Sequence, residues 1–319
     1  MSFVEELKKK LSEKLQKDNK KPLSPSSIEL YVKNLIRLND DEEFNNLNFL
    51  KKVDKVTKFL EDYKPNTQKI YLISIVSVLS LYKSERGYKN LYKKYYDLMM
   101  NLRNELKEIP TNQMSEQQKN NWMDWEEVMK IYEEVKGKVP IKIKNERDYQ
   151  KLLDYVILSL YVLNEPRRNM DYLKMGIIKN IPEVYEVVGG QDNYLNLDKD
   201  EFIFNNFKNF KSQGRQIIKF NNDFKQVINL YIKNRKDINP KQKKYFAYLL
   251  VDYEGHRIDK GNYITNVLNR LFKKKVGSSM LRHIYITFKF GKVNEEQQKT
   301  AYNMGHTQST QKEYIKTKE

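Results

Sequence analysis

The first 107 residues carry apolar side chains at the three- and four-residue spacing of amphipathic helices. Ser24-Pro25 is a helix start, because the hydroxyl can cap free backbone N–H groups and the proline ring already has a helical φ. Four helices are expected, starting near Pro25, Val53, Asn66 and Tyr88. Their buried positions are Ile28, Tyr31, Val32 and Leu35; Val53, Val56, Phe59 and Leu60; Ile70, Ile73, Val76 and Leu79 or near neighbours; and Leu91, Tyr92, Tyr95, Leu98, Met99 and Leu102. Such helices with short connections predict a compact bundle over residues 1–108.

Residues 109–121 have no apolar period, and Pro110 ends the preceding helix. We interpret this stretch as a linker to a second domain at 122–319. A linker of this length lets two domains close around a partner, although an ordinary surface loop has the same composition.

The second half mixes helices with strands. Helices are expected from Trp122 to Val135, from Tyr149 to Leu163, and again after Asp223. Strands are expected at Tyr194–Leu197, Glu201–Phe204 and Gln216–Phe220. The last two are separated by Ser212-Gln213-Gly214, which predicts a hairpin turn. The fold class is therefore mainly α with a small antiparallel β-sheet, in an α+β second domain.

Composition limits the function classes. Lys+Arg 59 against Asp+Glu 42 gives a net charge of +17, which favours a polyanionic partner, above all nucleic acid, over mere solubility. The chain has no cysteine, so disulfides and thiol chemistry are excluded, and three histidines disfavour a structural zinc site. No apolar run reaches membrane-spanning length, and the first residues, Met1 to Glu6, lack the apolar core expected of a signal peptide. We expect an intracellular protein, and the residue usage suggests a mobile element or a virus of a low-GC host.

The last forty residues contain groups suited to attack on a phosphate. Arg282 and His306 can neutralise charge on phosphoryl oxygens, and Tyr314, eight residues after His306, can supply a nucleophilic hydroxyl. With 23 tyrosines in the chain, this spacing alone proves little. The spacing of His306 and Tyr314 becomes informative only together with the segments that precede it in the chain.

The segment around Arg167-Arg168 gives the first of these. Arg168 is followed at three residues by Asp171 and at seven by Met175, and in this spacing the chain resembles the tyrosine recombinase (phage integrase) family, which is related to type IB topoisomerases. Arg167 does not fit the spacing and is assigned to DNA binding. The alternative is that both arginines only contact the DNA backbone.

The resemblance implies a catalytic lysine on a β-hairpin and a second arginine box. Lys208 matches the lysine, and Lys211, closer to the expected turn, is the competitor and a candidate DNA contact. Ser279-Met280-Leu281-Arg282-His283 matches the second box at Arg282 and His283, but Ser279 stands where a histidine is usual. A serine hydroxyl can still donate one hydrogen bond to a phosphate oxygen. His283 is either a partial substitute that contacts DNA or a structural histidine bonded to backbone.

The resemblance continues to the end of the chain. Met304-Gly305-His306 matches the family's Leu-Gly-His box, and Tyr314 falls at the nucleophile position. His256 belongs to no motif, and we expect it at the surface. In the first half, Ser24–Ile28 and Asn66–Lys69 resemble the family's helical core-binding domain.

The resemblance implies a mechanism without cofactor, metal or ATP. Tyr314 would attack the scissile phosphate of double-stranded DNA and form a 3′-phosphotyrosine bond, while Lys208 protonates the departing 5′-oxygen. A free phenol has a pKa near 10, so the surrounding cations must lower the cost of its ionisation, about 4 kcal/mol at neutral pH. The hypothesis requires that folding gather Arg168, Arg282 and His306 into one pocket.

Three functions remain open on the sequence. The favoured one is site-specific recombination or integration by four protomers on two duplexes, with a free chain that can be monomeric. Only five residues follow Tyr314, too few for a stable helix that would dock on a neighbour. Either contacts between protomers use other surfaces, such as the N-terminal helices, or assembly is weak. The alternatives are a type IB topoisomerase-like enzyme and a DNA-binding module that has lost catalysis.

Overall fold

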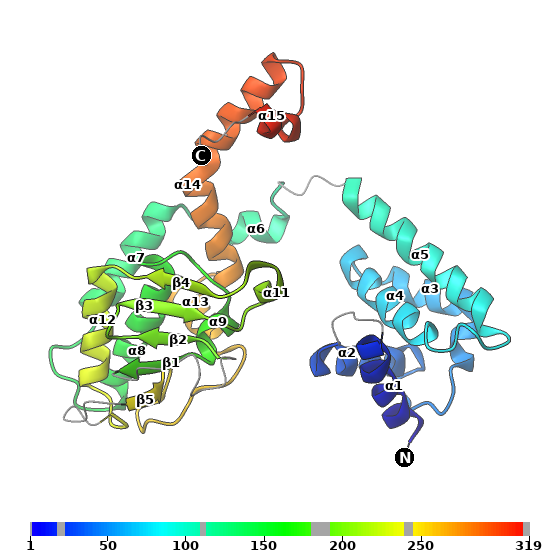
Figure 1. Ribbon diagram of the computed structural model, residues 1–319, viewed down its shortest axis with the longest axis horizontal. Helices are drawn as coiled ribbons and strands as arrows, with labels where there is room; N and C mark the ends of the chain where they lie inside the picture. Colours follow the sequence, from blue (N-terminus) through cyan, green and yellow to red (C-terminus); the bar gives the residue numbers. More distant parts are fainter. Residues whose placement is uncertain (1, 18–22, 109–112, 180–191, 239–244, 315–319) are drawn as a thin grey trace. The chain divides into compact units, whose positions relative to one another are not determined.

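The computed structural model describes residues 2–17, 23–108, 113–179, 192–238 and 245–314. The chain divides into two compact units, Met1–Gln113 and Met114–Glu319. Figure 1 shows helices alone in the first unit, and a small sheet with surrounding helices in the second. The expectation of a mainly helical protein with a small sheet is confirmed.

The first unit is a helical bundle. Its elements are α1 (Phe3–Lys17), α2 (Pro25–Leu38), the 3-10 helix η1 (Asn48–Lys51), α3 (Val53–Glu61), α4 (Pro65–Leu79) and α5 (Tyr88–Glu108). Ser24 caps α2 as expected, since its hydroxyl accepts a hydrogen bond from the Ser27 N–H at 3.2 Å. Helix α1 was not expected, although Phe3, Leu7 and Leu11 recur at helical spacing in the sequence. Leu7 and Leu11 are buried, and Phe3 and Val4 pack against the same core.

The core of this unit contains a buried polar contact between α2 and α4. The Asn34 side-chain amide donates to the Ser74 hydroxyl at 3.0 Å, and both residues are buried. On α4 the expected Val76 and Leu79 are buried, whereas Ile70 is 42% exposed and its neighbours Tyr71 and Leu72 face the core instead. The helix is apolar on nearly every side, so its period did not show which of these neighbours face inward.

The sheet of the second unit has five strands in the order β4-β3-β2-β1-β5. They are β1 (Gly176–Lys179), β2 (Tyr194–Asn196), β3 (Glu201–Phe204), β4 (Gln216–Lys219) and β5 (Tyr245–Tyr248). The three expected strands are present as β2, β3 and β4, whereas β1 and β5 were not expected. The sheet is mixed rather than wholly antiparallel, because β1 and β2 run parallel. Parallel neighbours need a longer crossover than a tight turn, and sequence pattern did not reveal it.

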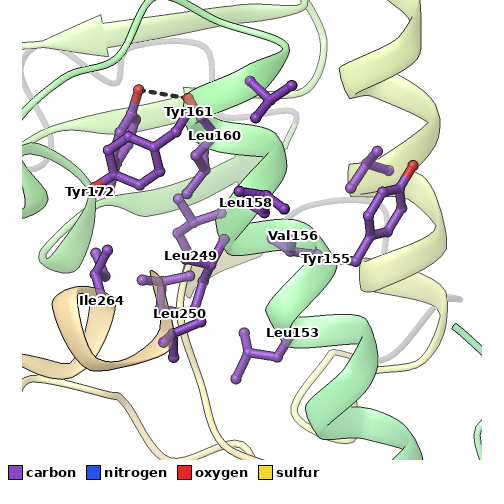
Figure 2. Packing of buried hydrophobic residues seen from close by; sticks show 14 of the residues in the cluster. Leu153, Tyr155, Val156, Leu158, Leu160, Tyr161, Tyr172, Leu249, Leu250 and Ile264 are labelled. Carbon is purple, nitrogen blue, oxygen red and sulfur yellow. Dashed lines mark hydrogen bonds between the residues drawn. The ribbon is translucent and has the colours of Figure 1, made fainter. Parts of the chain in front are cut away.

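The second unit also contains helices. They are α6 (Glu116–Asn121), α7 (Trp125–Gly137), α8 (Glu146–Val162), α9 (Asn169–Leu173), α11 (Phe210–Gln213), α12 (Asn222–Lys233), α13 (Tyr263–Phe272), α14 (Ser278–Asn303) and α15 (Gln308–Tyr314). Helix α8 is the centre of the core, with an unbroken buried run from Leu152 to Val162. Figure 2 shows its Leu158 and Leu160 close to Leu249, and Leu250 close to Ile264 of α13. Among the described helices, none is both long enough and apolar enough to cross a bilayer.

The expected linker contains a helix. The boundary between the units falls within residues 109–121, but residues 116–121 form α6. A capping box starts this helix, in which the Ser115 hydroxyl accepts from the Gln118 N–H and the Gln118 side chain accepts from the Ser115 N–H. The Lys275 N–H donates to the Asn121 side chain at 2.7 Å and so attaches α6 to the second unit. An all-polar helix has no apolar period, which is why it looked like a linker. Pro110 lies outside the described residues.

Candidate functional site

Two adjacent arginines between α8 and α9 lie in different surroundings. The Arg167 Nε donates to Asp171 Oδ2 at 3.0 Å, its Nη1 donates to Gln216 at 2.8 Å, and its guanidinium carbon lies 3.7 Å from the centre of the Phe204 ring. Asp171 and Phe204 are buried. These contacts hold α9 against β3 and β4 and occupy the guanidinium, so they give Arg167 a structural role and argue against the expected DNA contact.

Arg168 is the N-cap of α9, and it lies near enough to Arg282, in the second turn of α14, for its charge to act on that guanidinium. Burial and, next, the charge of Arg168 lower the pKa of Arg282, while Asp171 and Tyr161 act in the opposite direction. Among the described residues, neither guanidinium has an ion pair or a hydrogen-bond partner, and the Nε of Arg282 is buried. We call Arg168 and Arg282 the arginine pair. Two like charges held together in this way form a site for an anion.

The nearby carboxylate does not neutralise the arginine pair. Asp171 is 3% exposed, and its oxygen is bound to Arg167. Burial raises the pKa of Asp171, while the charges and hydrogen bonds of Arg167 and Arg168 lower it. One buried carboxylate faces three cations, so positive charge remains for a ligand.

A partly buried polar network lies behind Arg168. The Tyr161 hydroxyl of α8 donates to the Asn169 Oδ1 at 2.7 Å, and the Asn169 Nδ2 donates to the Thr265 hydroxyl of α13 at 2.8 Å. Thr265 also lies against Gly277, the N-cap of α14. The network thus joins the segments that carry Arg168 and Arg282. These residues could not be predicted from the sequence, because nothing local distinguishes Tyr161 from the other buried tyrosines.

The lysine candidates lie in the connection between β3 and β4. The two strands pair as a hairpin, as expected, but residues 205–215 replace the expected tight turn. They include α11, which ends at Gly214 with φ +68. Lys208 and Lys211 are exposed and have no hydrogen bond or ion pair with another described residue. The ring of Phe207 lies 5.1 Å from the Arg167 guanidinium carbon. Lys208, the next residue, is therefore close to the segment that carries Arg167 and Arg168.

The other residues of the second arginine box are on the surface. Ser279 and His283 are exposed on the first turns of α14, and neither has a hydrogen-bond partner among the described residues. His283 is therefore not the backbone-bonded structural histidine of the alternative interpretation. His256 is exposed near Asp252, with 3.3 Å between Nδ1 and Oδ2, as expected for a residue outside the site. The described residues contain no group of three acidic or histidine side chains that could hold a metal.

His306 and Tyr314 lie together at the far end of α14. Gly305 has a φ of +71, and the Gly305 and His306 N–H groups donate to the carbonyls of Tyr302 and Ala301. This is a Schellman motif, which ends the helix and favours glycine at that position. The His306 ring centre lies 5.5 Å from that of Tyr314, at an angle of 42°. Tyr314 is 66% exposed, so its hydroxyl can be reached.

The expected single pocket is absent from this conformation. Helix α14 runs unbroken from Ser278 to Asn303, and at 1.5 Å per residue Arg282 lies about 32 Å from its last residue. Figure 1 shows α14 leading away from the sheet, with α15 at its far end. The structure therefore brings together Arg168 with Arg282, and His306 with Tyr314, but keeps the two pairs apart. The physical reason is that α14 continues through Gly291, whose helix cost of about 1 kcal/mol is too small to stop it.

The comparisons with known proteins are weak. No family model matches the chain, and no curated protein matches it. Among solved structures, the chain is similar to the crystal structure of XerA recombinase, with 16% sequence identity and a TM-score of 0.30. The match covers 99% of this chain and 94% of that chain. A likeness with this TM-score supports no statement about function, which must be based on the residues themselves.

Proposed function

We propose that this protein is a site-specific tyrosine recombinase or integrase, which cleaves and rejoins double-stranded DNA through a 3′-phosphotyrosine intermediate. The arginine pair is the observation that carries the proposal. Two guanidinium groups from distant segments lie together without a neutralising partner among the described residues. Planar guanidinium groups match the oxygens of a phosphodiester.

The chemistry assigns a role to each candidate. The arginine pair binds the nonbridging oxygens of the scissile phosphate and stabilises the charge that develops on them. The Tyr314 oxygen forms a bond to phosphorus, the bond from phosphorus to the 5′-oxygen breaks, and Lys208 gives that oxygen a proton. The phenol proton leaves to water or to the neighbouring His306. Attack by a different 5′-hydroxyl reverses the step and joins new strands, so no cofactor is consumed.

The remaining candidates contact DNA around this phosphate. Ser279 can donate a hydrogen bond to a phosphate oxygen, and the exposed Lys211 and His283 can approach the backbone. The helical first unit would also bind the duplex, and recombination would involve four protomers on two duplexes.

The proposed reaction requires the two pairs of residues to meet. Because the two pairs lie far apart along α14, His306 and Tyr314 of some chain must reach the arginine pair when DNA is bound. The same separation favours a second candidate function, a DNA-binding module without catalysis, in which the pairs never meet.

A covalent trapping experiment separates these functions. The purified chain is mixed with a pool of nicked suicide duplexes of randomised sequence, in which cleavage releases a short strand that cannot religate. Protein–DNA adducts are isolated under denaturing conditions, and their ends are sequenced to map the cleavage site. We expect adducts that are linked through the 3′ end of the DNA and map to the peptide of Tyr314.

Two variants serve as test and matched control. Tyr314→Phe should abolish the adduct, whereas Tyr302→Phe, at another exposed tyrosine near the end of α14, should keep it. DNA binding without adduct in the wild-type chain would instead identify a binding module. Relaxation of supercoiled plasmid without site preference would identify a topoisomerase-like enzyme with the same chemistry.

A further inference from the structure

The middle of α14 has an uncovered apolar face. Ile286, Phe290 and Val293 are 52%, 47% and 48% exposed, and their i, i+4, i+7 spacing places them on one side of the helix. We call these three residues the stripe. The opposite side of the same helix is anchored to the second unit by the buried Leu281 and Ile284. Contiguous exposed apolar side chains in the middle of a helix indicate an interaction surface.

The stripe shares its side of α14 with both halves of the candidate site. At about 100° per residue, Ser279 and Arg282 lie on the same side as the stripe, toward the start of the helix. Toward its end, α15 is docked on that side, where the Gln308 side chain donates to Asn294 at 2.8 Å and to Gln297 at 3.2 Å. The order along one side is therefore arginine, stripe, and then α15 with His306 and Tyr314.

The order of groups along this side of α14 fits the same side of a second α14 that runs in the opposite direction. If two α14 helices lie antiparallel and centred on Phe290, residues 294–301 of one copy face residues 279–286 of the other. The α15 of each copy then faces the arginine pair of the other, and each stripe is covered. A two-fold axis produces both contacts at once, as in an isologous dimer.

We propose that α14 is the interface with a second copy of this chain, and that His306 and Tyr314 of one copy act at the arginine pair of the other. The inference rests on the proposed function. The second copy is the occupant because the site is incomplete within one chain and the apolar side is self-complementary. The association needs no break in α14, whereas a bend at Gly291 that completed the site within one chain would disrupt helical hydrogen bonds.

A complementation experiment tests the proposal. Tyr314→Phe and Arg282→Ala chains, distinguished by mass, are incubated separately and as an equimolar mixture with a duplex that carries the mapped cleavage site. Each variant alone should give no adduct above background. The mixture should give adduct at about a quarter of the wild-type yield, because half of the dimers are mixed and each has one intact site of two. All of this adduct should be on the Arg282→Ala chain, which keeps Tyr314.

The outcomes distinguish the two proposals. If the wild-type chain forms adduct but the mixture forms none, the pairs meet within one chain and the interface proposal is wrong. If the wild-type chain forms no adduct, the proposed function itself fails.

A stripe variant gives an independent check. Phe290→Lys should lower the adduct yield of the complementing mixture at least tenfold, while the thermal unfolding midpoint stays unchanged because Phe290 is not in the core. Asn229→Lys adds the same charge at an exposed position of α12, outside α14, and should keep the yield. An undiminished yield with Phe290→Lys would overturn the proposed interface.

Discussion

The two ends of α14 are built differently. At its start, Leu281 and Ile284 are buried in the core of the second unit, and the Tyr285 ring lies 5.2 Å from that of Trp125. At its end, the helix contacts α15, and among the described residues the local Schellman motif and the side chain of Gln308 hold His306 and Tyr314 in place. The part of the site that binds charge is therefore fixed by tertiary packing, whereas the nucleophile is held only by local structure.

This difference suits the proposed chemistry. Electrostatic stabilisation is most effective when the charged groups are positioned before the substrate arrives, since no reorganisation is then needed. The repulsion between Arg168 and Arg282 costs stability, and the core around α8, α9 and the start of α14 offsets it. A nucleophile that must move between sites benefits from a contact that is easily released.

The largest expected effect concerns the arginine pair. Arg282→Ala should lower the rate of adduct formation by about 10²- to 10³-fold, the usual cost of removing one group that stabilises developing charge. It should leave the unfolding midpoint unchanged or slightly higher, because it also removes a repulsion. Single-turnover trapping and thermal denaturation measure the two quantities. The matched control is Arg167→Ala, which breaks the pair with buried Asp171 and should cost about 3 kcal/mol of unfolding free energy.

A second prediction compares packing at two positions of α14. Leu281→Ala should cost about 2–5 kcal/mol of unfolding free energy, because a fully buried leucine leaves a cavity. Phe290→Ala, on the exposed stripe, should change it by less than about 0.5 kcal/mol in the isolated chain. Urea denaturation at low protein concentration measures both. Equal destabilisation would mean that the stripe is covered within the chain.

The polar network behind Arg168 should have an intermediate effect. Asn169→Ala leaves the buried hydroxyl of Tyr161 without its partner and should cost about 1–3 kcal/mol. If the network positions Arg168, the rate of adduct formation should fall as well, at temperatures where the variant is fully folded. Tyr161→Phe removes the donor without leaving a hydroxyl unpaired and should be milder in both measurements. A normal cleavage rate in the folded Asn169→Ala chain would give the network a structural role only.

The smallest effect is expected at the end of α14. Gly305→Ala places a Cβ on a left-handed residue with φ +71 and should cost about 1 kcal/mol. Because this turn is local, the strain should displace His306 and slow adduct formation several-fold while the global unfolding midpoint stays constant. Gly137→Ala, at an open helical position with an ordinary φ, is the control; it should leave adduct formation unchanged and should not lower the midpoint. A lowered global midpoint would show that the end of α14 unfolds together with the core.

Local signals in the sequence were sufficient for much of the fold. The cap at Ser24-Pro25, the four expected helices of the first unit and strands β2 to β4 follow from side-chain period and turn chemistry. Strands β1 and β5 were missed because they pair with each other across a long stretch of sequence, and neither forms a hairpin with the strand next to it in the chain. Helix α6 was missed because its polar sequence has no apolar face.

The sequence by itself determined which chemical groups this protein can use: the order of arginines, lysine, histidine and tyrosine, and the absence of thiols. It also distinguished Arg168 from Arg167 by spacing, and the structure places them in different surroundings. Tertiary structure decided that Arg168 and Arg282 lie within reach of each other's charge, since Asn169 of α9 contacts Thr265 of α13 and Thr265 in turn lies against Gly277 at the start of α14. Tertiary structure also determined that α14 continues through Gly291. The local cost of glycine in a helix is about 1 kcal/mol, which is too small to outweigh the packing contacts that distinguish a straight helix from a bent one.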